Sequence, residues 1–435
     1  MILAERSSRG LAGGLSLCAL FGVLSPISLA QTPQKPIESL ANRQASIKGL
    51  VVRGQEDGSN QGLSMDIIVT AKARTGKNAE HEVVLKGMVG SSMRTSAVEA
   101  LRFVEFVHPK LQKTEFELSF ADKYTPKDGG SAGSAFTLLL LSLAEGWSID
   151  PKGAITGDIT VDGKIREVGG VGAKVRAAAL DGCLVVSIPE PNRAALDDFV
   201  FLFPQETLWQ VQVFFSSTVD EARATLRTDR AEQLAEAMKQ FNLLAEELRK
   251  NARYLNTPAA IEQLQKVIEL EPRHLSAATL LKQATRTGPR TLSTSSSLEE
   301  TFTRGGAVLQ QVYKMRQARD RLPPNQRGNL LPDLSVAVTD NAGKRLRELN
   351  KFVHPDVKPL LTVTLDVQAA ADSIAKAYDV VNTPSTTAAR RATMQRAMEK
   401  GQRDLDTAWV KFEKAMEAIK SDRELVEKLF RGSGV

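Results

Sequence analysis

The sequence predicts a mixed α/β (α+β) domain followed by a mostly α-helical region. Up to about residue 227, short runs of alternating and β-branched residues are interleaved with helical patterns, whereas strand patterns mostly disappear from Arg230 onward. A chain of 435 residues, of which 42% are hydrophobic and 25% charged, is long enough for two or three domains and can bury a sizeable core. We therefore expect domains at 45–227, 228–285 and 298–435.

Residues 1–30 are typical of a secretory signal peptide. Two arginines precede an apolar segment, and Ser28-Leu29-Ala30 supplies the small residues of a cleavage site. We expect cleavage near Ala30 and a periplasmic or secreted protein with no transmembrane segment after removal of the signal. The alternative is that the segment is kept as an N-terminal membrane anchor. Cys18 would leave with the signal, so that Cys183 has no partner for an internal disulfide.

Alternating and helical patterns predict the elements of the first domain in order. The helix expected at 132–145 is apolar on nearly every side, so it should be buried. A hairpin is expected at 154–168, because Asp162-Gly163 is a strong turn signal between two short strand patterns. The other expected strands lie at 47–53, 63–71, 81–86, 114–120, 183–188 and 211–215, and the other helices at 91–107, at 171–180 and from Thr218.

The region after residue 228 is expected to consist of helices. The pair at 259–281 resembles one tetratricopeptide hairpin, but such repeats need about three units, so we interpret it as a helix pair. Residues 287–297, rich in Ser and Thr with Gly and Pro, predict a linker, and 322–333 a second break. Helices are expected at 230–254, 258–270, 275–284, 298–322, 341–352, 367–381 and 387–429.

The formal net charge of +6 comes mainly from the C-terminal half of the chain. Its lysine and arginine clusters are usually solvated helix faces, and no interleaved aromatic residues or nucleic-acid motif accompany them. Nucleic-acid binding by this half is therefore only a third and weaker hypothesis. The four histidines form no pair with ligand spacing, so we expect no metal and no other cofactor.

The segment 124–133 is the strongest candidate for chemistry. Gly129 and Gly130 allow a sharp turn, and Ser131 falls where the loop becomes a helix. Unpaired N–H groups and the positive end of the helix dipole favour a negative charge beside such a hydroxyl, as acyl transfer requires. Taken alone, the same pattern is more simply an N-cap serine behind a turn.

Several ordered motifs resemble the proteolytic domain of the Lon protease family. The run Pro126-Lys-Asp-Gly-Gly-Ser131-Ala-Gly is similar to that family's serine segment, Pro-Lys-Asp-Gly-Pro-Ser-Ala-Gly. The run from Ile155, Ile-Thr-Gly-Asp-Ile-Thr, resembles its Thr-Gly-Glu-Ile-Thr hairpin. Gly169-Gly-Val-Gly-Ala-Lys174 resembles Gly-Gly-Leu-Lys-Glu-Lys, whose last lysine is catalytic, and the separation of 43 residues from Ser131 to Lys174 fits. The resemblance covers about residues 45–225 and implies the fold of a Lon-type proteolytic domain.

The resemblance implies a serine endopeptidase with a Ser-Lys dyad. Ser131 would be the nucleophile and Lys174 the general base, which must be neutral and therefore needs a pKa lowered by burial. Thr156 would hold the lysine amine by a hydrogen bond, and N–H groups around Gly130 and Ser131 would form the oxyanion site. Asp128 matches the family's aspartate beside this loop, with either a structural or a catalytic role.

The chain also departs from the family's pattern. Gly130 replaces a proline, Asp158 a glutamate, and Gly172-Ala173 a Lys-Glu pair. Because glycine at position 130 makes the loop more flexible, the resting loop can be inactive and become ordered when substrate binds. Family members commonly carry an ATPase module, but no Gly-x-x-x-x-Gly-Lys-Ser/Thr motif is present, so ATP hydrolysis is not expected.

The sequence therefore gives two main hypotheses of function. The first is an exported, ATP-independent peptidase that cleaves unfolded or flexible polypeptides and assembles as a homo-oligomeric ring, commonly a hexamer in this family. The second is a non-catalytic adaptor that keeps the peptidase fold and binds protein partners through its basic helical half.

Overall fold

The computed structural model describes residues 40, 42–54, 60–73, 83–122, 124–321, 331–338, 342–383 and 386–421. The chain divides into two compact units, Met1–Glu38 and Ser39–Val435, and all elements given below belong to the second. The expected signal peptide at 1–30 lies outside the described residues. Within the described ranges, no helix combines the length and the apolar character needed to cross a membrane.

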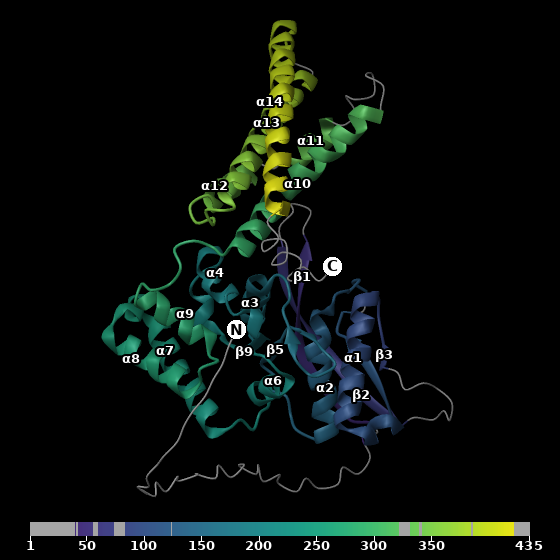
Figure 1. Cartoon of the computed structure of the whole chain (residues 1–435), viewed down its shortest axis with the longest axis vertical. Coiled ribbons are helices and arrows are strands. Elements are labelled where there is room, and N and C mark those ends of the chain that lie inside the picture. The colour runs from purple at the N-terminus through teal and green to yellow at the C-terminus, as the bar shows by residue number, and fades with distance from the viewer. Residues whose placement is uncertain are drawn as a thin grey trace, which may run out of the picture. The chain divides into compact units, whose positions relative to one another are not determined.

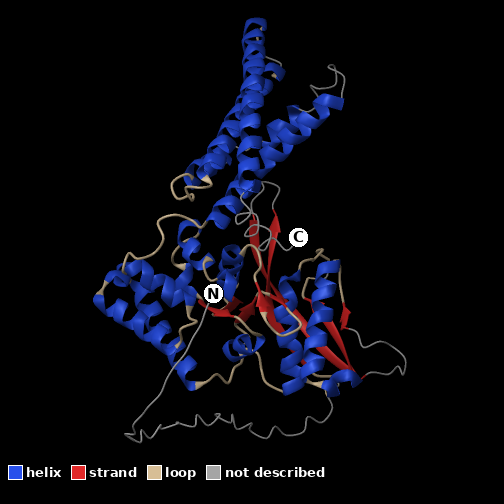
Figure 2. Ribbon diagram, in the orientation of Figure 1, coloured by secondary structure: helices blue, strands red, loops and turns tan. Residues whose placement is uncertain are grey.

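A mixed sheet is the centre of the first half of the chain (Figure 2). Among the described residues it has seven strands in the order β3-β4-β2-β1-β5-β8-β9. The pairs β1–β2 and β2–β4 are antiparallel, and the other neighbouring pairs are parallel. The strands are β1 (Gln44–Gly54), β2 (Asn60–Ala73), β3 (Val83–Leu85), β4 (Thr114–Phe120), β5 (Gly153–Ile155), β8 (Val185–Pro189) and β9 (Gln212–Ser216), while β6 (Asp158–Ile159) and β7 (Ile165–Arg166) pair with each other.

Helices cover both faces of this sheet. Side chains alternate between the two faces along each strand. Ala154 and Ile155, which are adjacent in β5, belong to cores on opposite faces. One face is covered by α1 (Ser91–Val107), α2 (Gly133–Glu145) and α6 (Val219–Leu226), and the other by α3 (Val171–Leu180), α4 (Ala195–Leu202) and α5 (Thr207–Gln210). Short 3-10 helices are η1 (Pro109–Lys113), η2 (Gly130–Ala132), η3 (Glu190–Asn192) and η4 (Ala252–Asn256).

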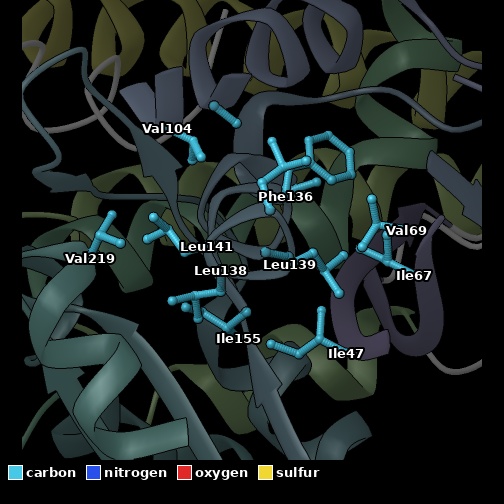
Figure 3. Close-up of a cluster of buried hydrophobic side chains, with 14 of the residues drawn as sticks. Ile47, Ile67, Val69, Val104, Phe136, Leu138, Leu139, Leu141, Ile155 and Val219 are labelled. Carbon is cyan, nitrogen blue, oxygen red and sulfur yellow. The ribbon is translucent and has the colours of Figure 1, made fainter. Parts of the chain in front are cut away.

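Helix α2 lies at the centre of the first core, as its apolar sequence predicts. Every residue from Gly133 to Leu143 is buried. Figure 3 shows Phe136 and Leu139 facing side chains from the sheet and from neighbouring helices. Because α2 begins directly after η2, this packing fixes the position of the serine turn at its start.

The helix pair after residue 228 shares a core with the sheet. The fully buried His274 packs between the rings of Phe214 and Phe241, with centroid distances of 4.6 and 4.5 Å. Burial lowers the pKa of His274 to about 3, so the ring is neutral and acts as a core residue. The hydroxyl of Ser276 bonds the N–H of Val213 and the carbonyl of Val211, which covers part of the edge strand β9. The helices are α7 (Glu232–Lys250), α8 (Pro258–Leu270) and α9 (Leu275–Ala284).

The remaining helices form a separate apolar core. Helices α13 and α14 pack along each other as an antiparallel pair (Figure 1). Phe201 of α4 stacks on Phe352 with ring centroids 5.7 Å apart, so this core also contacts the first half of the chain. The helices are α10 (Thr294–Arg321), α11 (Leu331–Ala337), α12 (Ala342–Leu349), α13 (Lys358–Asn382) and α14 (Ala388–Ser421).

The predicted fold class, a mixed α/β domain followed by a helical region, is confirmed, but several local expectations need correction. The helix expected at 367–381 already begins at Lys358. In the expected hairpin at 154–168, Ala154 and Ile155 join the main sheet between β1 and β8, and only 158–166 form a hairpin. The expected linker at 287–297 ends early, because α10 already begins at Thr294. The expected break at 322–333 is described only from Leu331, where α11 begins.

Candidate active site

Ser131 lies in the turn that joins the glycine pair to α2. Gly129 has a φ of 111°, a conformation that residues with a side chain rarely adopt, and η2 begins at the next residue. The carbonyl of Ser131 accepts the N–H of Gly157 at 3.0 Å, and the N–H of Ser134 bonds the carbonyl of Gly157 at 3.0 Å. The serine turn is thereby fastened to the segment that follows β5 and carries Thr156.

Lys174 is buried in the first turn of α3. Gly170, with a φ of 67°, is the N-cap residue directly before this helix, and its carbonyl accepts the N–H of Lys174 at 3.0 Å. The side chain is only 4% exposed, and its Nζ donates to Oγ1 of the fully buried Thr156 at 3.2 Å. The backbone of β2 covers the same turn, since a Cβ on Gly62 would lie 2.0 Å from the carbonyl oxygen of Ala173.

This environment changes the acid–base character of Lys174. Burial lowers the pKa of its amine to about 8, while the carboxylate of Glu299 acts in the opposite direction. A lysine with such a pKa is partly neutral near neutral pH, which is the form that can accept a proton.

The structure brings some of the expected site residues together, but it shows no hydrogen bond between the side chains of Ser131 and Lys174. Thr156 contacts Lys174, and the neighbouring Gly157 contacts the backbone of Ser131. Among the residues that the structure describes, however, the hydroxyl of Ser131 makes no hydrogen bond, and the amine of Lys174 bonds Thr156 instead. Proton transfer between Ser131 and Lys174 therefore requires a local movement.

Asp128 stabilises the neighbourhood of the serine turn by capping a helix. Its Oδ1 accepts the N–H of Gly129 at 2.8 Å and the N–H of Met93, in the first turn of α1, at 3.1 Å. These hydrogen bonds lower the pKa of Asp128. Gly90 allows this approach, because a Cβ there would lie 2.2 Å from the Asp128 carboxyl carbon.

Replacing Asp128 by alanine is expected to destabilise the fold by about 1 kcal/mol through loss of this cap. Asp128→Asn keeps an acceptor oxygen and should recover most of the difference. Urea unfolding of both variants at neutral pH measures it. A catalytic carboxylate would give a different pattern, in which the asparagine variant is stable but loses turnover as fully as the alanine variant.

Gly130 lies beside the carboxyl group of the half-buried Asp158. A Cβ at Gly130 would be 3.2 Å from Oδ1 of Asp158, and the hydroxyl of Ser96 donates to the carbonyl of Gly130 at 3.3 Å. Desolvation raises the pKa of Asp158. The two departures from the family's pattern at positions 130 and 158 are thus neighbours, and a larger residue at position 130 would crowd this carboxyl group.

Sequence reasoning gave no role to Lys127, although it lies inside the quoted serine motif. The side chain is buried, and Nζ donates to the carbonyls of Asp122 at 2.5 Å and Thr125 at 2.7 Å. Its backbone pairs with Met88, so Lys127 closes the loop before the serine turn. The described residues contain no group of three or more His, Cys, Asp or Glu side chains arranged to hold a metal ion.

The order of these motifs around the mixed sheet defines the class of the first half of the chain, a Lon-type proteolytic domain. Residues 56–227 match the family model described as the Lon protease (S16) C-terminal proteolytic domain. This segment of the chain is therefore similar to that domain.

Similar curated proteins carry the name Lon protease. The protein from Endomicrobium trichonymphae is 33% identical over 153 residues, which cover 34% of this chain and 18% of the relative. The protein from Fusobacterium nucleatum subsp. nucleatum is 32% identical over 188 residues, which cover 41% of this chain and 23% of the relative. The protein from Koribacter versatilis is 29% identical over 233 residues, or 50% and 28% of the two chains. The chain thus spans only 18–28% of the length of these relatives.

Proposed function

We propose that the chain is an exported, ATP-independent serine endopeptidase of Lon type that cleaves unfolded or flexible polypeptides. Ser131 is the nucleophile and Lys174 the general base. The observation that carries this proposal is the buried lysine amine, 3.2 Å from Thr156 on the segment that also holds the serine turn. The family match over residues 56–227 supports the peptidase class, and the pattern of residues 1–30 supports export.

In the proposed reaction, Lys174 first shifts from Thr156 toward Ser131. Oγ of Ser131 attacks the scissile carbonyl carbon while the neutral amine of Lys174 takes the hydroxyl proton. Backbone N–H groups at Gly130 and Ser131, which begin η2 and have no acceptor within that turn, stabilise the oxyanion. The resulting ammonium returns its proton to the leaving amine nitrogen, and water then hydrolyses the acyl-enzyme with Lys174 again as base.

Turnover is expected to rise with pH through a midpoint near 8 and to reach a plateau above it. Burial lowers the pKa of Lys174 to about 8, and only the deprotonated amine is a base, so the rate follows the neutral fraction. The measurement is the initial rate on fluorescently labelled unfolded casein between pH 6 and 10. A rate that stays constant from pH 6 to 10 would contradict Lys174 as the base.

Covalent labelling tests the nucleophile directly. A fluorophosphonate probe is expected to modify Ser131 at one label per chain, as located by mass spectrometry of the digested protein, and heat-unfolded protein is the control. Labelling that leaves Ser131 untouched in a protein that cleaves casein would overturn the assignment.

The second candidate function is a non-catalytic adaptor. One observation favours it: the Ser131 hydroxyl makes no hydrogen bond among the described residues, and Lys174 is held by Thr156. An adaptor would show neither casein turnover nor labelling of Ser131, yet would bind its partners through the basic helical half. Either function is compatible with a homo-oligomeric ring.

A further inference from the structure

The serine turn is held from outside by the hydroxyl of Ser96 in α1. Ser96 is only 3% exposed, and its Oγ donates to the carbonyl of Gly130 at 3.3 Å. The same carbonyl accepts the N–H of Gly133, which closes the three-residue turn η2 from within. Ser96 therefore gives this turn a hydrogen bond that comes from another element.

The place of Ser96 on α1 suits this contact. Met93, whose N–H donates to Asp128 at 3.1 Å, lies three residues earlier, and residues three apart share one face of a helix. This face of α1 thus contacts the chain both just before the serine turn and within it. Met93 and Ala97 are buried in the first core, so packing fixes the position of the face.

The peptide group between Gly130 and Ser131 decides where one of the proposed oxyanion donors points. A trans peptide is planar, so its C=O and its N–H point in opposite directions. A hydrogen bond on the carbonyl of Gly130 therefore also fixes the direction of the N–H of Ser131. Within the described ranges this N–H makes no hydrogen bond of its own, so it is available to a ligand oxygen.

Glycine at position 130 gives this restraint its importance. The proline of the family's pattern would fix φ at this position, whereas glycine leaves both of its dihedral angles free. The surroundings leave little room for a side chain, because a Cβ at Gly130 would lie 3.2 Å from Oδ1 of Asp158 and 3.4 Å from Oγ of Ser96. A flexible residue thus precedes the candidate nucleophile, and a hydroxyl of α1 restrains it.

Two other acceptors compete for the hydrogen of the Ser96 hydroxyl. The carbonyl of Ser92, one turn earlier in α1, lies 3.2 Å from Oγ, and a hydroxyl has only one hydrogen to donate. Desolvation raises the pKa of Asp158, and a hydrogen bond from Ser96 acts in the opposite direction. Because the hydroxyl is shared and Gly133 also binds the Gly130 carbonyl, loss of the hydroxyl should loosen the peptide group without freeing it completely.

We infer that Ser96 is a positioning residue for the oxyanion site: its hydroxyl, on the carbonyl of Gly130, holds the N–H of Ser131 in the direction in which it can bind the oxyanion. In this role Ser96 acts through the backbone of the turn and leaves the base Lys174 unchanged. The inference rests on the proposed function, but the orientation of the peptide group can be measured without turnover.

NMR can follow this peptide group directly. Protein labelled with ¹³C at the glycine carbonyl and with ¹⁵N serine selects the peptide bonds of Gly-Ser pairs, and the signal of Gly130–Ser131 is assigned by its loss in Ser131→Ala. Ser96→Ala is expected to move this signal upfield in ¹³C, because the carbonyl loses a donor. Thr95→Val is the matched control: it removes an exposed hydroxyl that donates to the carbonyl of Ser91 in the same helix, and it should leave the signal in place.

Casein turnover shows whether this orientation contributes to catalysis. In Ser96→Ala we expect kcat to fall about 10-fold with KM unchanged, which is less than the roughly 10²-fold loss that follows outright removal of an oxyanion donor. The rate should fall at every pH while its midpoint stays near 8, because the burial of Lys174 is unchanged. Damage to the fold around Lys174 would instead move the midpoint.

The two measurements separate this inference from the proposed function. A shifted peptide signal in Ser96→Ala, together with no Ser131-dependent turnover in the wild type, supports the restraint on the peptide group and refutes the proposed peptidase. An unchanged signal in Ser96→Ala, an equal shift in Thr95→Val, or an unchanged kcat when the wild type is active overturns the inference.

Discussion

Replacing Lys174 by methionine is expected to abolish peptide-bond cleavage while making the fold more stable at neutral pH. Methionine fills nearly the same space as the lysine stem but cannot accept a proton, so turnover of unfolded casein should fall at least about 10³-fold. A buried lysine with a structural role alone would have no such effect on turnover.

The gain in stability follows from the cost of burying the amine. The pKa of Lys174 is about 8 in the fold and about 10.5 in an unfolded chain. The unfolded chain therefore binds more protons between these values, and burial costs up to about 3 kcal/mol at any pH below 8. This cost fades as pH rises from about 8 toward 10.5. The buried Thr156 hydroxyl loses its partner in the variant, which offsets about 1 kcal/mol.

Urea unfolding at pH 7 and at pH 10 measures the gain in stability and its decrease at high pH. The free energy of unfolding of Lys174→Met should exceed that of the wild type at pH 7, and the difference should shrink at pH 10. Ser131→Ala is the matched control, because it should abolish turnover without changing stability: its hydroxyl makes no hydrogen bond among the described residues. Casein turnover that survives both substitutions would refute the dyad.

Local sequence signals were sufficient for much of the fold. The predicted helices at 91–107, 171–180, 258–270 and 275–284 and the strand at 114–120 have the observed bounds. For α8 the reason is visible in the sequence, since Pro258 stands at the first helical position and the hydroxyl of Thr257 accepts the N–H of Ala260. Such caps act over a few residues, so they can be read from the chain.

Features that depend on residues distant in the sequence could not be predicted from it. Residues 294–297 have the composition of a linker, yet they begin α10. Oγ of Ser293 caps this start by accepting the N–H of Ser296 at 3.2 Å, and the carboxylate that holds both serine hydroxyls belongs to Asp198 in a different element. Helices α4, α5 and α11 have only four to eight residues each and were not predicted, because so short a segment gives only a weak helical period.

The candidate site shows the same division between local and distant signals. Motif order predicted a site of Ser131, Lys174 and Thr156, and the Lys174–Thr156 hydrogen bond, which the resemblance implied, is present. The conformation of the serine turn was not readable, because it depends on how 128–131 pack against the first turn of α1 and against Asp158. The helix cap made by Asp128 is a contact across more than thirty residues, visible only once the chain is folded.

Replacing Phe136 by alanine is expected to cost about 3–5 kcal/mol of folding free energy. Its ring is fully buried in α2 and packs edge-on against Phe120 of β4, with centroids 6.4 Å apart. The core around this ring is built by side chains of both the sheet and α1 (Figure 3). These side chains can therefore relax only partly into the cavity that removal of the ring would leave. Phe106→Ala on α1 is the matched control, because that ring is 83% exposed and should cost less than about 0.5 kcal/mol. Urea unfolding followed by circular dichroism measures both variants. Since α2 begins at the serine turn, Phe136→Ala should also reduce fluorophosphonate labelling of Ser131 in the protein that remains folded. An equal loss of stability in Phe136→Ala and Phe106→Ala would show that α2 is not the packing centre of the domain.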